Sequence, residues 1–272
     1  MESTTIDSPH LWRLVLGIAP GALHAVAFST VADATMIYRR LTLGGSDSLH
    51  RQLEEAIYAA PWLLSDFGRV DIAVSTPYFT VVPAGLDDDG LAASLTDIAG
   101  DTPDAVELLS DSTPQCRVVW ALDADCRRFL ARTFRNAPVH HAISPLLKYF
   151  DTVSSASNRA KLFVHLSDET PRRLDIIEYD ASGCLRMAVS KEWEVDNDAL
   201  YYILSVAELT GFDRENDELQ LCGDQTLRSR LSTLLSRYVR HVLPLIFPSA
   251  ALRSGREAFR APFPLVILPL CE

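Results

Sequence analysis

Two adjacent histidines, His140 and His141, are the residues most open to a chemical interpretation, because imidazole nitrogens bind metals and transfer protons near neutral pH. In a strand, however, adjacent side chains point to opposite faces. No third ligand stands at a spacing typical of a zinc site. The pair therefore predicts no metal site.

The five cysteines are also poor candidates for chemistry. They are odd in number, widely separated and include no C-x-x-C pair, so neither a zinc site nor a redox motif is indicated. Cys116, Cys184 and Cys222 lie in or beside apolar runs, and we expect them to be buried structural thiols. No local Ser-His-Asp or Cys-His motif stands out, although such groups assemble in space.

Charge and composition exclude further classes. The 272 residues are 48% hydrophobic and carry a net charge of -11, which is typical of an acidic globular protein. Nucleic-acid binding requires phosphate neutralisation, so neither nucleic acid nor an anionic membrane is an expected partner. The first residues do not resemble a secretory signal, and the longest apolar stretches are too short to span a bilayer. We expect a soluble, cytoplasmic protein.

The elements that must position any site begin with three strands joined by short turns. They are expected over residues 11–19, 22–30 and 34–43, with Pro20-Gly21 as the first turn. A helix over residues 49–60, capped by Asp47, and a strand over 70–74 follow. Residues 83–115 hold eight Asp or Glu and no Lys or Arg, and predict an inserted acidic surface loop. A partner-binding flap is the alternative for that loop.

The same order of elements then recurs. A strand over 116–122, a helix capped by Asp123 and a second helix over 144–150 precede a polar stretch, residues 151–159, expected as a lobe boundary. Three further strands, a helix ending at Gly211, a strand over 218–222 and another helix complete a second unit. The apolar tail, Pro262 to Leu270, is expected to add a strand to a sheet.

Two tandem units of this kind resemble the lobes of the actin-like ATPase fold, which includes actin, Hsp70 and sugar kinases. More closely, the chain resembles the bacterial domain of unknown function 3822 family, whose members are similar to that fold. The resemblance implies an α/β (α+β) protein with two RNase H-like lobes of mixed sheets flanked by helices, over residues 1–152 and 160–272. It is carried by Cys116–Ala121, Lys161–Leu166, Asp196–Leu204 with Tyr201-Tyr202, Leu219–Asp224 and Pro262–Glu272.

The actin-like fold implies a phosphate-binding turn in each lobe, in which an Asp serves the metal or the attacking water and a Gly admits the phosphate. The first equivalent turn, Gly17 to Gly21, has no Asp and no Thr, and its Pro20 lacks an N–H donor. Its two glycines also lack the spacing of a dinucleotide-binding loop. An ordinary hairpin is therefore expected here.

In the second equivalent turn, His165 replaces the Asp and Ser167 replaces the Gly, with Asp168 nearby. The third element keeps one glycine, Gly223, followed by Asp224, whose alternative role is to cap the next helix. The nucleotide-site candidates are therefore Ser167, Asp168, Gly223 and Asp224, and no catalytic or metal-binding residue is assigned.

These observations favour a non-catalytic, actin-like pseudo-ATPase that binds or scaffolds another protein, through the acidic loop or the cleft between lobes. No cofactor is expected. The alternative is an atypical nucleotide-binding protein or ATPase that uses Mg-ATP at a degenerate site between the lobes, with Asp168 and Gly223. The partner, the pathway and the oligomeric state are not determined by the sequence.

Overall fold

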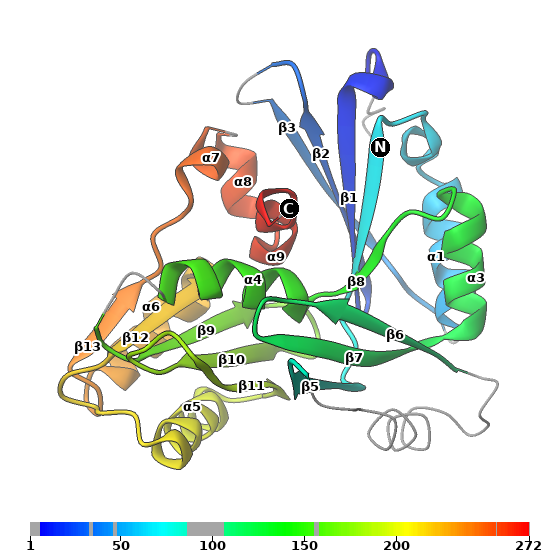
Figure 1. Ribbon diagram of the computed structural model, residues 1–272. Coiled ribbons are helices and arrows are strands. Elements are labelled where there is room, and N and C mark those ends of the chain that lie inside the picture. The colour runs from blue at the N-terminus through cyan, green and yellow to red at the C-terminus, as the bar shows by residue number, and fades with distance from the viewer. Residues whose placement is uncertain are drawn as a thin grey trace. The chain divides into compact units, whose positions relative to one another are not determined.

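The computed structural model describes residues 6–32, 35–45, 48–85, 106–154, 158–253 and 255–271. It divides into two compact units, shown with their elements in Figure 1. Unit 1 comprises Met1–Ser144 and Ser249–Leu270, and unit 2 comprises Pro145–Pro248 with Cys271. The last helices therefore return to the first unit. The predicted cap of the first helix, Asp47, lies outside the described residues.

Unit 1 is built on a five-stranded sheet in the order β3-β2-β1-β4-β8. The first three strands are antiparallel neighbours, whereas β1, β4 and β8 run parallel. The middle strands are almost continuously buried, as expected for a sheet covered on both faces. The strands are β1 (Trp12–Ala19), β2 (Ala22–Ser29), β3 (Met36–Thr42), β4 (Arg69–Val74) and β8 (Val139–His141).

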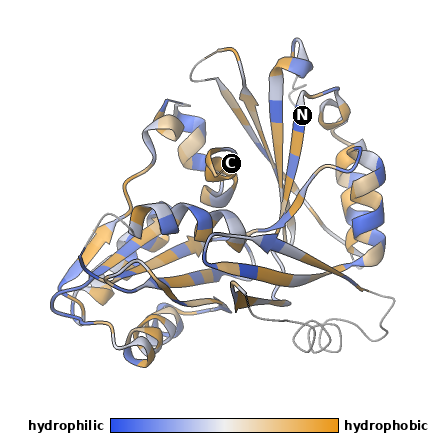
Figure 2. Cartoon of the chain, viewed as in Figure 1, coloured by the Kyte–Doolittle hydropathy of each residue, from blue (hydrophilic) through white to orange (hydrophobic). Residues whose placement is uncertain are grey.

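Two amphipathic helices of unit 1, α1 (Leu49–Tyr58) and α3 (Ala124–Thr133), pack against each other. Helix α3 begins as predicted, because the Asp123 carboxylate accepts a hydrogen bond of 2.7 Å from the Cys126 amide. Short 3-10 turns cover Pro9–Leu11 (η1) and Pro61–Leu64 (η2). Figure 2 shows orange, hydrophobic residues concentrated on the central strands and mixed colours on α1 and α3.

A separate three-stranded antiparallel sheet of unit 1 corrects the prediction of an acidic loop over residues 83–115. Its order is β5 (Phe79–Pro83), β7 (Cys116–Asp123) and β6 (Val106–Ser112), so the C-terminal part of that segment is a strand. Strand β6 pairs with β7 from Val106 to Ser112. Its polar composition hid it, because β6 obtains its hydrogen bonds from β7 and buries only Asp111. Residues 86–105 lie outside the described residues.

Unit 2 repeats the arrangement with the sheet order β11-β10-β9-β12-β13. Strands β9, β10 and β11 are antiparallel, and β9, β12 and β13 are parallel. Its helices are α4 (Ile143–Ser154), α5 (Asp196–Thr210) and α6 (Gln225–Leu235). The strands are β9 (Lys161–Ser167), β10 (Arg173–Tyr179), β11 (Leu185–Glu192), β12 (Glu218–Gly223) and β13 (His241–Pro244).

The two faces of the unit 2 sheet are covered by different helices. On one face, α5 and α6 contribute Ile203 and Leu231 to a hydrophobic core that includes Leu162, Val164 and Leu174 of the strands. On the other, Phe150 of α4 stacks on Phe163 with ring centroids 4.2 Å apart. The chain passes from unit 1 to unit 2 between Ser144 and Pro145, in the first turn of α4, whereas a boundary was expected within residues 151–159.

The prediction of a C-terminal strand over Pro262–Leu270 is wrong. The segment forms α9 (Phe263–Ile267) and a 3-10 turn, η4 (Leu268–Leu270), after α7 (Ser249–Leu252) and α8 (Arg256–Arg260). All five residues of α9 are buried, so the segment is apolar throughout. A continuous apolar run fits a buried strand and a buried helix equally well, and periodicity does not distinguish them. Pro264 is compatible with the first turn of a helix, where its missing N–H is not needed.

Cysteine burial follows the prediction in two cases of three. Cys116 and Cys222 are buried, but Cys184 is exposed, because it lies in the turn before the edge strand β11. All five cysteines lie among the described residues, and none of them forms a disulfide. Among the described residues, no helix is long and apolar enough to cross a membrane.

Candidate functional site

The four sequence-predicted candidates meet at one edge of the unit 2 sheet. Strands β9 and β12 are parallel and pair from Glu218↔Lys161 to Gly223↔Leu166, so both end at this edge. Ser167 ends β9 and Gly223 ends β12, with Asp168 and Asp224 following them. The carboxyl ends of parallel strands are where α/β sheets usually bind ligands. The structure therefore brings the four candidates together.

The backbone around Gly223 is occupied by the protein itself. Gly223 has a φ of +95°, and a Cβ there would lie 2.0 Å from the carbonyl oxygen of Leu166. The next amide, of Asp224, donates a hydrogen bond of 2.9 Å to the same oxygen. The Asp224 carboxylate accepts from the Leu227 amide at 2.8 Å and caps α6, as predicted. Packing and capping thus account for the glycine and for one carboxylate oxygen.

Ser167 and Asp168 have fewer interactions. The Ser167 hydroxyl accepts a long contact of 3.4 Å from the amide of Glu169. Asp168 is exposed in the turn that follows. This carboxylate is the candidate best placed to meet a ligand from solvent.

A hydrogen-bonded row across β9, β10 and β11 was not anticipated. Asp175 accepts from the His165 Nδ1 at 2.9 Å and from the Ser190 hydroxyl, and the Arg173 guanidinium lies 3.5 Å away. Burial favours the neutral acid, but the His165 hydrogen bond and the Arg173 charge outweigh it and hold the pKa of Asp175 well below its ordinary value. The carboxylate is therefore ionised, and both of its oxygens accept hydrogen bonds from groups of the sheet.

A thiol lies beside this row without forming a nucleophile. Cys222 pairs with His165 in the register of β12 and β9. Burial and the Asp175 charge raise the pKa of Cys222 well above its ordinary value. Because the thiolate is the reactive form, Cys222 is an inert thiol despite its histidine and aspartate neighbours.

The equivalent edge of unit 1 contains a tight hairpin. Strands β1 and β2 stay paired up to Ala19↔Ala22, so only Pro20 and Gly21 form the turn, as the sequence predicts. Gly21 has a φ of +73°. Further back along β1, a Cβ at Gly17 would lie 2.5 Å from the Leu265 side chain of α9. The space that Gly17 leaves is therefore filled by a hydrophobic side chain.

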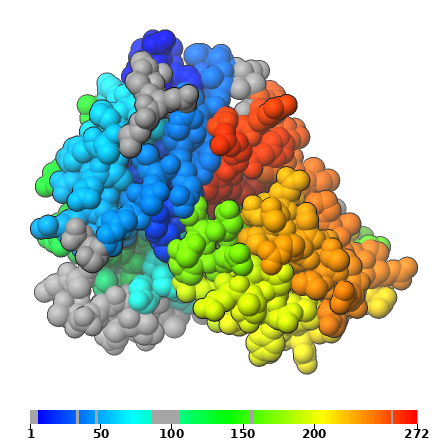
Figure 3. All heavy atoms as spheres, turned by 180° about the vertical axis from the view of Figure 1, so that it is seen from behind, coloured from blue at the N-terminus to red at the C-terminus, as the bar shows by residue number. Residues whose placement is uncertain are grey.

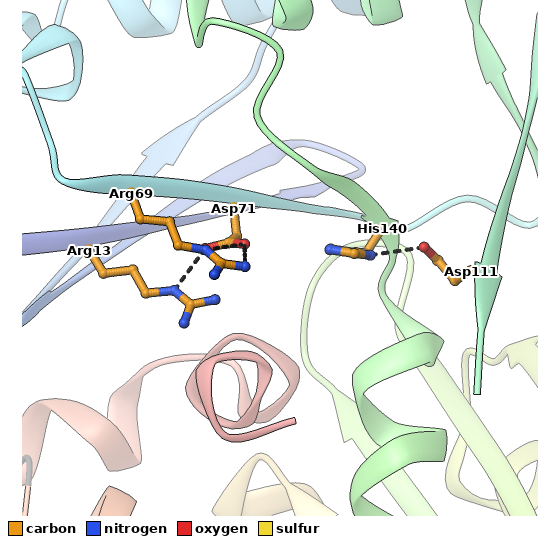
Figure 4. Close-up of polar contacts among 5 residues, drawn as sticks. All are labelled: Arg13, Arg69, Asp71, Asp111 and His140. Carbon is orange, nitrogen blue, oxygen red and sulfur yellow. Dashed lines mark hydrogen bonds and ion pairs between the residues drawn. The ribbon is translucent and has the colours of Figure 1, made fainter. Parts of the chain in front are cut away.

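Unit 1 also holds a buried ion-pair cluster, drawn in Figure 4. Asp71 is 1% exposed and accepts from the Arg13 Nε at 2.7 Å. Arg69 approaches the same carboxylate with its Nε at 3.2 Å and a terminal nitrogen at 3.0 Å. Two guanidinium groups thus hold one carboxylate, which is a stable arrangement for a buried charge.

Asp111 of β6 organises the two histidines of β8. Its carboxylate accepts from the His140 Nδ1 at 2.9 Å, the His141 amide at 2.7 Å and the Ser144 hydroxyl at 2.6 Å. Burial raises the pKa of Asp111, but these hydrogen bonds outweigh burial and lower it. Figure 4 shows the other edge of the His140 ring turned away from Asp111. Asp111 was missed because it is 29 residues from His140 in the sequence.

His141 has a structural role. Its Nε2 donates to the Thr76 carbonyl at 2.9 Å, and its Nδ1 accepts from the Ile143 amide at 3.2 Å, which defines a neutral tautomer. His140 and His141 point to opposite sides of β8, as predicted. Within the part of the chain that the structure describes, no three His, Cys, Asp or Glu side chains are grouped to hold a metal ion.

Comparison with known proteins identifies the family and the fold. The family described as "Protein of unknown function (DUF3822)" matches residues 2–242, and the chain belongs to it. A search of curated proteins finds no match. A crystal structure from Bacteroides thetaiotaomicron, of a protein with actin-like ATPase fold and unknown function, is 21% identical over 89% of this chain and 94% of that chain, with a TM-score of 0.77.

A second solved structure, a "PilM-PilN type IV pilus biogenesis complex", is 12% identical over 95% of this chain and 98% of that chain, with a TM-score of 0.50. At these identities the likeness concerns the fold. The chain therefore has the actin-like ATPase fold, with mixed α/β sheets flanked by helices.

Proposed function

We propose that this protein is a non-catalytic, actin-like module that binds or scaffolds another protein. The observation that carries the proposal is the first hairpin, where β1 and β2 pair up to Ala19↔Ala22. A two-residue turn containing Pro20 offers few amides to a phosphate, since proline has no N–H. Phosphoryl transfer depends on positioned donors and cations around the phosphates.

The second unit supports the same proposal. His165 stands where the resemblance implies a metal-binding Asp, and the nearest buried carboxylate, Asp175, already receives His165 and Ser190 hydrogen bonds. Gly223 approaches the Leu166 carbonyl and leaves no space on that side for a ligand. These groups stabilise the sheet, and their interactions within the protein leave few donors or acceptors for a metal-phosphate ligand.

Support for protein binding comes from the fold comparison. PilM, whose chain is covered to 98%, is described in a complex with PilN. A scaffold of this kind can keep a binding role without catalysis, because binding depends on surfaces and not on the phosphate turns. By this proposal the partner is another protein, and no cofactor is needed.

One observation favours the alternative of an atypical nucleotide-binding protein. Asp168 is exposed at the same sheet edge as Ser167, Gly223 and Asp224. A carboxylate there could hold Mg²⁺ through water and offset its own repulsion of a triphosphate.

Calorimetric and thermal-shift titrations of the full chain with Mg-ATP, Mg-ADP and Mg-GTP separate the two functions. The proposal expects no saturable heat and no change in Tm at millimolar nucleotide. Asp168→Asn is the test variant, and Glu194→Gln, an exposed acid elsewhere in unit 2, is its control. Saturable binding that disappears in Asp168→Asn alone would establish the alternative.

The protein-binding part of the proposal is tested by capture from native extract, with the full chain as bait. The expected result is one partner in a stoichiometric amount, with recovery unchanged by added Mg-ATP. An unrelated acidic protein of equal net charge serves as the control bait. Recovery of no stoichiometric partner would count against a scaffolding role.

A further inference from the structure

One stretch late in the chain of this acidic protein is rich in arginine and poor in acids. Residues 225–260 contain no Lys and only one acid, Glu257. The same stretch holds a run of arginines: Arg228, Arg230, Arg237, Arg240, Arg253, Arg256 and Arg260. The first four of these arginines belong to unit 2, and the last three, Arg253, Arg256 and Arg260, belong to unit 1. With Glu257 as the one acid among them, the last three give their part of unit 1 a local positive charge that suits negative groups.

Helices α7 and α8 of unit 1 carry part of this charge. They bury small side chains and expose large apolar ones. Their inward residues are small, since Ala251 is 3% exposed and Ala258 is fully buried. Their large apolar residues face solvent instead, with Leu252 46% and Phe259 61% exposed. An exposed aromatic side chain beside arginines has the composition that is enriched at protein interfaces.

Arginines flank these apolar side chains in the sequence, and Arg256 and Phe259 share one side of α8, because residues three apart are neighbours on a helix. Arg253 and Arg256 are exposed, and the side chain of Arg260 is 70% exposed, with an ion pair of 3.1 Å to Glu257. We call Arg256, Phe259 and Arg260, which stand at positions i, i+3 and i+4 of α8, the Arg-Phe face. Helix α8 packs against β3, a strand that also carries Arg39 and Arg40. In Figure 3 the orange-red residues of these helices lie at the surface beside the blue strands of unit 1.

We propose that the Arg-Phe face binds an acidic segment of a partner protein that also carries large apolar side chains. This inference rests on the proposed protein-binding function and names the chemistry of the partner. Arginine pairs with carboxylates through two parallel hydrogen bonds, and a phenylalanine can act as the desolvated anchor of an interface. A nucleic acid or membrane fits less well, because the net charge of -11 repels an extended polyanion while a short segment meets only the local field.

The test uses two fluorescein-labelled peptides of equal negative charge with the full chain. One peptide repeats Glu-Glu-Leu-Glu-Glu-Phe, and the other replaces its Leu and Phe with Ser. Fluorescence anisotropy at about 0.15 M salt is expected to show at least about tenfold tighter binding of the apolar peptide. Phe259→Ala should remove most of that preference, and Arg256→Glu should weaken binding of both peptides.

Arg51→Glu is the matched control, because it makes the same charge change at an exposed position of α1, away from the Arg-Phe face. It should leave both affinities within about twofold, and Phe259→Leu should retain most of the preference for the apolar peptide. Unfolding midpoints verify that each variant is folded. Equal binding of both peptides, or equal weakening by Arg51→Glu, would overturn the proposal.

Two further titrations test whether another anionic ligand binds the Arg-Phe face. Single-stranded DNA and phosphatidylserine vesicles are titrated under the same conditions. Binding to either that exceeds peptide binding and ignores Phe259→Ala would replace the proposal with a polyanion site. These outcomes are independent of the nucleotide titrations, so the failure of this inference and the failure of the pseudo-ATPase proposal are distinguishable.

Discussion

The sheets of the two units share a strand arrangement but stabilise their buried carboxylates differently. In unit 1, Asp71 of β4 is held by two guanidinium groups, from Arg13 and Arg69. In unit 2, Asp175 of β10 is held by an imidazole and a hydroxyl, from His165 and Ser190, with Arg173 farther away. An arginine offers a charged fork of several N–H donors to a carboxylate, whereas an imidazole Nδ1 and a hydroxyl each offer one hydrogen bond.

The two units also differ at the strand edges where the resemblance to the actin-like fold implies phosphate turns. Unit 1 closes its turn to two residues and places Leu265 over Gly17, so its edge is short and apolar. Unit 2 keeps a longer turn with Asp168 exposed, but uses its inner polar groups to satisfy one another. Unit 2 therefore has more polar groups at this edge, and the unit 1 turn keeps glycines but has no Asp and no Thr.

The largest expected effect breaks the ion pairs of unit 1. Asp71→Asn leaves Arg13, whose side chain is 12% exposed, without its carboxylate, and should reduce the free energy of unfolding by about 3–5 kcal/mol. Urea unfolding measures the change. Asp66→Asn, which removes an exposed pair with Arg135, should change stability by less than about 1 kcal/mol. Equal losses of unfolding free energy in Asp71→Asn and Asp66→Asn would show that burial does not strengthen the ion pairs of Asp71.

The next prediction compares one glycine from each unit. Gly223→Ala should destabilise the protein by about 3 kcal/mol, because its Cβ would meet a backbone oxygen at 2.0 Å with φ at +95°. Gly17→Ala meets only the tip of Leu265, which can rotate, and should cost about 1 kcal/mol. Thermal unfolding of both variants tests the order. A larger loss for Gly17→Ala would show that α9 is packed more rigidly than the β9–β12 junction.

Acid sensitivity sharpens the comparison for unit 2. The pKa of Asp175 is lower in the folded state than in the unfolded chain, so its stabilisation is complete above about pH 4–5 and is lost as the pH falls further. In Asp175→Asn, unfolding at pH 7 should require about 2 kcal/mol less, and the decline of stability between about pH 5 and pH 2 should be shallower. If the free energy of unfolding fell equally steeply with pH in the wild-type protein and in Asp175→Asn, Asp175 would not be the source of the acid sensitivity.

The smallest expected effect concerns Glu178, three residues along β10 from Asp175. Glu178 is 2% exposed, and its Oε2 has no hydrogen-bond partner among the described residues. Burial raises its pKa, so its ionisation destabilises the fold as the pH rises above the ordinary value for a glutamate. Glu178→Gln should therefore add about 1 kcal/mol at pH 7 and nothing at pH 4. A loss of stability at pH 7 would indicate that the ionised carboxylate is satisfied.

Local signals in the sequence predicted the elements well. Pro20-Gly21 marks a two-residue hairpin, and Asp123 and Asp224 each precede an apolar helical face and cap that helix. These features depend on neighbours within a few residues. The tail was assigned as a strand because a fully buried short helix and a buried strand share a continuous apolar run, and only packing distinguishes them.

The four candidate residues lie at one sheet edge, and their role as a site stays a prediction. Parallel pairing of β9 and β12 brings Ser167 and Gly223 to one edge, as the resemblance implied. The hydrogen bonds of Asp175 and Asp111 could not be predicted, because they depend on the register of strands that are distant in the sequence. A shift of one residue in either pairing would turn these carboxylates to the opposite face.

The amino-acid sequence alone determined the repeated order of strands and helices, the acidic character and the closed first turn. Each follows from composition, or from residues close enough along the chain to restrict one another's backbone. Tertiary structure alone decided which carboxylates are neutralised within the sheets and which apolar side chains remain outside. Those outcomes depend on burial and on strand register, and both exist only once distant segments pack together.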